Sequence, residues 1–102
     1  MENAYLFSFL PPDRAEALLA KYFLDLEAKS QQLTTFLSEN NMAGIRQTAH
    51  SLKGSGKSYG FDYVTELGTK LSAFAKEENH GALGNLIREF REWLRGHAPD
   101  LS

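Results

Sequence analysis

Residues 42–60, MAGIRQTAHSLKGSGKSYG, decide the fold of this chain of 102 residues. Their apolar and small residues recur at alternating intervals of three and four, which places them on one side of an α-helix. This row consists of Met42, Ile45, Ala49, Leu52, Gly56 and Tyr59. Gly60 follows directly and is typical of the left-handed residue that ends a helix. The stretch therefore predicts an amphipathic helix that packs one face against other elements.

The same stretch contains the letters GSGKS, residues 54–58, which are similar to the end of a nucleotide-binding phosphate loop. Such a loop needs G-x-x-x-x-G-K-[ST] between a buried strand and a helix. Ser51 stands where the first glycine belongs, and the residues before it have helical spacing. No alternation of strands and helices follows that would build the parallel sheet beneath such a site. We therefore favour a helix over a phosphate loop.

Helical spacing continues on both sides of this stretch. A first helix is expected from Pro11-Pro12-Asp13 to about Glu39, and the polar Ser30 in its apolar row is a candidate site for a kink. Asn40 and Asn41 indicate the end of that helix and the next N-cap. Two more helices are expected, separated by a turn at residues 77–81. The first runs from about residue 62 to 76, and the second carries the apolar residues from Leu83 to Leu94 and stops at Gly96. The inward-facing residues of these three helices are Leu19, Tyr22, Phe23, Leu26, Leu33, Phe36, Leu37, Val64, Leu67, Leu71, Phe74, Ala75, Leu83, Leu86, Ile87, Phe90 and Leu94.

The fold class predicted by this pattern is all-α. No window alternates with period two, so strands are not expected, and short connections force consecutive helices to run in opposite directions. We expect an antiparallel up-down-up-down four-helix bundle over residues 11–102, with residues 1–10 as an extension that packs on it. The apolar part of that extension, YLFSFL at 5–10, has no basic region before it and is too short for a signal peptide or a membrane span.

Composition excludes several classes of function. The formal net charge is −2 and the signs are interleaved, whereas nucleic-acid binding needs a clustered basic face. The absence of cysteine excludes disulfides and thiolate metal sites, and it allows a reducing compartment. The three histidines have no metal-ligand spacing, so no metal site is expected. The even mixture of charges makes a monomer the expected state.

A strip of polar residues lies opposite the apolar row of residues 42–60. At helical spacing this strip contains Arg46, His50, Lys53, Gly54 and Lys57. Each glycine costs a helix about 1 kcal/mol relative to alanine, so Gly54 and Gly56 need a reason. We expect Gly56 to admit a neighbouring helix and Gly54 to clear the approach to His50.

An exposed imidazole beside lysines suits a nucleophile that receives a phosphoryl group. Imidazole titrates near neutrality, so a neutral ring nitrogen is available, and lysines pair with phosphate oxygens. A surface histidine near lysines is, however, most often only solvated. The spacing alone leaves both interpretations of His50 open.

The residues Ala49-His50-Ser51-Leu52-Lys53-Gly54-Ser55, with Gly60 further on, resemble the signature of histidine-containing phosphotransfer (HPt) domains. The resemblance implies that His50 accepts the phosphoryl group through its outer ring nitrogen, that Lys53 helps to hold the phosphoryl oxygens, and that Gly54 gives the partner room. Arg46 matches the basic or polar position that the family usually has one turn before the histidine. Relatives often orient the ring with a Gln or Glu at the position of Ser72, and here Thr69 or a water could replace that residue.

The resemblance also implies partners. A receiver domain of a response regulator would donate or accept the phosphoryl group, and a sensor or hybrid histidine kinase would stand earlier in the relay. Mg²⁺ and the acidic pocket would belong to the receiver, and this chain would be a cytoplasmic carrier without kinase or hydrolase activity of its own. The alternative is a helical adaptor domain in which His50 is never phosphorylated.

Overall fold

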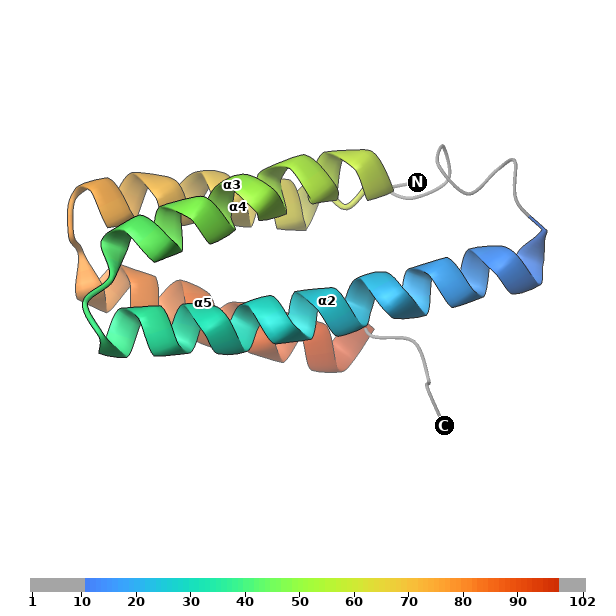
Figure 1. Cartoon of the computed structure of the whole chain (residues 1–102), viewed down its shortest axis with the longest axis horizontal. Helices are drawn as coiled ribbons and strands as arrows, with labels where there is room; N and C mark the ends of the chain where they lie inside the picture. Colours follow the sequence, from blue (N-terminus) through green and yellow to red (C-terminus); the bar gives the residue numbers. More distant parts are fainter. Residues whose placement is uncertain (1–10, 98–102) are drawn as a thin grey trace.

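The computed structural model describes residues 11–97, which form four helices: α2 (Pro12–Ser38), α3 (Met42–Tyr59), α4 (Asp62–Lys76) and α5 (His80–His97). No strand occurs within that range. In Figure 1 the colours along the chain show that successive helices run in alternating directions. The expected all-α four-helix fold is confirmed. The packing expected of residues 1–10 lies outside the described residues.

The four helices form two layers. In Figure 1, α3 and α4 lie side by side on one face, and α2 and α5 lie beneath them, with the first turns of α2 extending past the other helices. Each inward-facing residue expected from the sequence is buried or packs against the buried core. Phe61, between α3 and α4, is also buried, although its position in a turn gave no periodic signal. The layer of α3 and α4 carries the site described below.

Local hydrogen bonds begin and end α3 at the expected residues. The Asn41 side chain accepts a hydrogen bond from the Gly44 amide at 2.9 Å, which satisfies one of the unpaired donors of the first turn. Gly60 adopts φ 78°, and the Phe61 amide donates to the carbonyl of Gly56 at 2.8 Å. These contacts close the helix and turn the chain into α4.

The turn expected at residues 77–81 is shorter in the structure. The Asn79 side chain accepts a hydrogen bond from the amide of Ala82 at 3.1 Å, so the cap lies at Asn79 and α5 begins at His80. His80 and Gly81 are therefore helical, which corrects the expected turn. At the other end, α5 runs one residue past Gly96, to His97.

Ser30 does not interrupt α2. The residue is only 2 % exposed, and its hydroxyl donates to the Glu27 carbonyl at 2.7 Å. A buried hydroxyl with a partner inside its own helix leaves no unsatisfied polar group. The helix therefore continues through this position as one element from Pro12 to Ser38.

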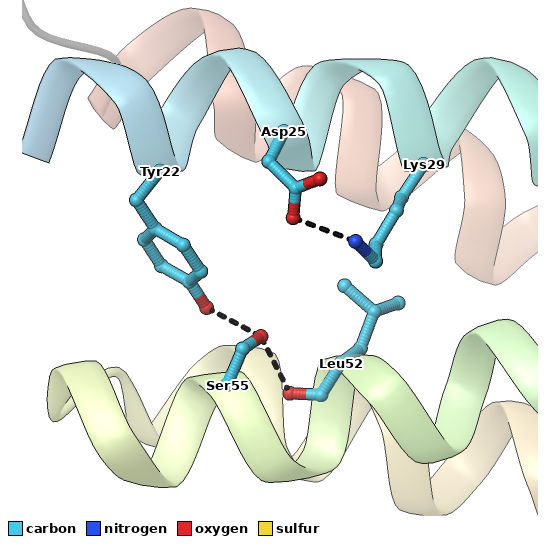
Figure 2. A network of polar contacts seen from close by, with 5 residues as sticks. All are labelled: Tyr22, Asp25, Lys29, Leu52 and Ser55. Atoms are coloured by element: carbon cyan, nitrogen blue, oxygen red, sulfur yellow. Dashed lines mark hydrogen bonds and ion pairs between the residues drawn. The ribbon is translucent and has the colours of Figure 1, made fainter.

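A hydrogen bond joins α2 to α3 near the C-terminal end of α3. Figure 2 shows Tyr22 of α2 reaching across to Ser55 of α3. The two hydroxyl oxygens lie 3.0 Å apart. The Tyr22 ring stacks on Tyr59 with a centroid distance of 4.0 Å. Burial raises the pKa of Tyr22 to about 12, because a phenolate would be poorly solvated there. This contact ties the helix that carries His50 to the opposite layer.

Candidate functional site

His50 lies near the middle of α3 and its side chain is exposed. Arg46, Lys53, Gly54 and Lys57 are exposed on the same helix, whereas the row that includes Ala49 and Leu52 is buried. The face assignment made from helical spacing is therefore confirmed. An imidazole presented on a rigid helix can be approached from solvent without rearrangement of the core.

Two hollows open on either side of His50. One, of about 300 Å³, lies between α3 and α4 and is lined by His50 and Lys53 together with Thr69, Ser72 and Lys76 of α4. The other, of about 400 Å³, is lined by His50, Arg46 and their neighbours on the first turns of α3. A cationic side chain thus borders the imidazole on each side. Lys57 lines neither hollow.

Gly54 leaves the surface beside His50 open. A Cβ at this position would meet no atom within 4 Å apart from its own helical turn, so nothing in the fold requires glycine there. The glycine instead keeps the surface low next to an exposed imidazole. The role expected of Gly54, clearing the approach to His50, stays a prediction.

The ring of His50 makes no hydrogen bond with any residue of the range 11–97. Thr69 and Ser72 both line the hollow next to the ring, and the Thr69 hydroxyl donates to the Thr65 carbonyl at 3.1 Å. Orientation of the ring by Ser72, Thr69 or a water stays a prediction.

Gly68 is a residue of the site that was not predicted from the sequence. A Cβ at Gly68 would stand 2.5 Å from the Ala49 carbonyl oxygen and 2.8 Å from the Lys53 amide nitrogen, on the turn that carries His50. At the other glycine contact, a Cβ at Gly56 would stand 2.6 Å from the Thr65 amide nitrogen, as expected of a residue that admits a neighbouring helix. The sequence did contain a signal for this contact, a glycine within the apolar row of α4. A glycine inside a helix lowers helix stability, and no turn at this position explains its presence.

The other two histidines have structural partners. Nε2 of His80 lies 2.7 Å from the Asn40 side-chain oxygen, and the His97 ring stacks on Trp93 at 4.6 Å. Among residues 11–97 no group of three His, Asp or Glu side chains is arranged to hold a metal ion. None of the helices in that part of the chain combines the length and the apolar character that crossing a membrane requires.

The fold and the site define a class of protein, a four-helix bundle that presents a histidine on its second helix. The family model of the Hpt domain matches residues 17–97, so this chain belongs to the Hpt domain family. Membership implies a role as a carrier in two-component phosphorelays, and the family interacts generally with receiver domains and histidine kinases. Comparison with curated proteins and with solved structures found no significant match.

Proposed function

We propose that this chain accepts a phosphoryl group on His50 from the aspartate of a receiver domain, or from a kinase, and passes it to another receiver. The observation that carries the proposal is the exposed His50 on α3, between hollows that Lys53 and Arg46 line. His50 lies within residues 17–97, the range that matches the Hpt family, and this position supports the proposal. A cytoplasmic location is part of the same proposal.

The proposed reaction uses the neutral imidazole as a nucleophile. The lone pair of Nε2, the ring nitrogen farther from the backbone, attacks the phosphorus of an aspartyl phosphate while Nδ1 keeps its proton. An N–P bond forms, the P–O bond to the aspartate breaks, and the carboxylate leaves. The same steps in reverse transfer the group to the next receiver. Lys53 stabilises the phosphoryl oxygens through charge, and the receiver supplies the acidic pocket with its Mg²⁺.

The residues around His50 have separate roles in the proposed transfer. Gly54 allows the receiver to bring its aspartate close, and Arg46 and Lys57 face the acidic pocket of the partner from either end of the strip. Electrostatic complementarity of this kind raises association rates and leaves affinity modest, which suits a carrier that must release its partners. Ser72 and Thr69 orient the ring, directly or through water.

The test is phosphorylation by a receiver domain labelled on its aspartate. We expect label that is stable in alkali and lost in acid, and none on H50Q. The double variant H80Q/H97Q is the matched control, because it keeps His50 and removes the other two histidines of the chain. Label on H50Q equal to that on the control would show that the acceptor assignment is wrong. An adaptor role predicts receiver binding by every variant and label on none.

A further inference from the structure

The hollow between α3 and α4 has a second cationic residue in its wall. Gly68, Ser72 and Lys76 follow one another at intervals of four residues along α4 and all line this hollow. On the α3 side the lining residues include His50 and Lys53. Residues four apart share one face of a helix, so the row on α4 ends at Lys76, across the hollow from α3.

The direction of the side chains brings these groups together. The Cα–Cβ bonds of a helix tilt toward its N-terminus, so Lys53 leans back along α3 toward His50. Consecutive helices run in opposite directions (Figure 1), and for the same reason Lys76 leans back along α4 toward the level of Ser72. Among residues 11–97 neither lysine is paired with a carboxylate. Both ammonium groups therefore remain available to an anion in the hollow.

The short Ser72 leaves this space open. A Gln or Glu at that position would extend into the hollow from the middle of the row, whereas a serine side chain ends at its first heavy atom beyond Cβ. The hollow's volume of about 300 Å³ is far larger than the roughly 10–15 Å³ that one water molecule needs. A phosphoryl group on the adjoining imidazole has room to enter it.

We propose that Lys76 contacts the phosphoryl group carried by His50, so that Lys53 and Lys76 hold it from the two walls of the hollow and lengthen the life of the phosphohistidine. The inference rests on the proposed function. Loss of the group occurs when water attacks phosphorus, the N–P bond breaks, the imidazole takes a proton and inorganic phosphate leaves. Phosphoryl transfer passes through a loose transition state in which the group loses charge toward metaphosphate. Nearby cations therefore stabilise the dianionic starting state more than this transition state, which slows the loss of the phosphoryl group.

The experiment uses the full chain phosphorylated with phosphoramidate, a small donor that needs no partner protein. Wild type is compared with K76M, K76R and K70M. Lys70 is an exposed lysine of α4 that does not line the hollow, so K70M is the matched control for loss of one charge from the same helix. We expect K76M to shorten the half-life of the phosphohistidine about twofold to fivefold. This is the change in rate that the loss of one exposed ion pair would cause. K76R and K70M should stay near wild type.

A second measurement distinguishes contact of Lys76 with the phosphoryl group from an effect of Lys76 on the stability of the fold. An opposite charge lowers the pKa of an acid, so ³¹P NMR should show a higher pKa for the second ionisation of the phosphoryl group in K76M than in K70M. Lys76 also lies in the last turn of α4, where a cation interacts favourably with the helix dipole and stabilises the helix. Thermal unfolding measures this contribution to stability independently.

The outcomes distinguish the two proposals. Labelled wild type with equal half-lives and equal ³¹P titrations in K76M and K70M would overturn the role of Lys76 and leave the carrier function intact. A K76M variant that loses stability but keeps the half-life would do the same. If neither a labelled receiver nor phosphoramidate labels His50, the proposed function fails and the inference fails with it.

Discussion

Gly68 of α4 lies directly against Lys53 of α3, where a Cβ at position 68 would stand 2.8 Å from the amide nitrogen and 3.1 Å from the Cα. Gly56 makes the converse contact with Thr65, so each helix contributes one glycine to a backbone-to-backbone approach. The two contacts lie at different levels along the pair. Gly68 contacts the turn from Ala49 to Lys53, which carries His50, directly, whereas Gly56 reaches that turn only through Thr65, whose hydroxyl donates to the Lys53 carbonyl at 3.5 Å.

Replacing Gly68 with alanine should therefore affect stability and phosphorylation together. The new Cβ pushes α4 away from the turn that carries His50, and overpacking of this kind costs about 1–3 kcal/mol, partly offset by about 1 kcal/mol of helix propensity. Thr69 and Ser72 then move away from the imidazole. We expect a lower free energy of unfolding in urea and slower labelling of His50 by phosphoramidate.

Gly56→Ala is the matched comparison for that variant. Its Cβ would stand 2.6 Å from the Thr65 amide nitrogen, so a comparable loss of unfolding free energy is expected. The new Cβ reaches the turn that carries His50 only indirectly, through the Thr65 hydroxyl, so labelling should slow less than in Gly68→Ala. Equal slowing in variants of equal stability would mean that Gly68 has no special influence on His50.

Gly54→Ala should change stability and transfer in opposite directions. No neighbouring atom lies within 4 Å of a Cβ at this position, so the substitution should raise the free energy of unfolding by up to about 1 kcal/mol. The added methyl group stands where a receiver domain approaches. Transfer from a labelled receiver should slow, while labelling by phosphoramidate should not change. Undiminished transfer from the receiver would contradict the clearance role of Gly54.

The hydrogen bond between Tyr22 and Ser55 should contribute to stability without affecting phosphorylation. Tyr22→Phe keeps the ring stacked on Tyr59 and removes the hydroxyl, which typically costs about 0.5–1.5 kcal/mol. Ser55 keeps its contact with the Leu52 carbonyl at 3.3 Å, so the lower end of that range is expected. A double-mutant cycle in urea with Ser55→Ala measures the coupling. Zero coupling would show that the bond adds nothing to the fold.

Stability should fall at alkaline pH because two tyrosines are protected from ionisation. Burial raises the pKa values of Tyr22 and Tyr63 to about 12, from 10.0, and Glu89 adds to the effect at Tyr63. The folded state therefore holds these protons more tightly than the unfolded state. This contribution is complete below pH 10 and is lost as the pH rises through 12.

Urea unfolding between pH 9 and pH 12 tests that expectation. The wild-type free energy of unfolding should decline more steeply than that of Y22F/Y63F, which cannot ionise at these positions. Tyrosinate absorbance should show two groups that titrate late in the wild type and are missing from the variant. Parallel declines would contradict protection of the two phenols.

Helical periodicity made most of the fold predictable from the sequence. The row from Met42 to Tyr59 and the exposed strip around His50 follow from 3.6 residues per turn, a local property of the backbone. Asn41 and Gly60 were predictable for the same reason, since caps depend on the residue itself and its neighbours. The start of α5 was misplaced because one side chain, that of Asn79, decides it.

The sequence by itself determined which helix presents His50, which face it lies on, and that Lys53 and Gly54 lie beside it. Only the tertiary structure decided that Gly68 supports the turn of His50 and that Ser72 and Lys76 share its hollow. These residues lie eighteen or more positions from His50 in the chain. Their proximity depends on the axial position of α4 relative to α3. The two close backbone contacts at Gly56 and Gly68 restrict that position. Periodicity within one helix contains no information about its register against another.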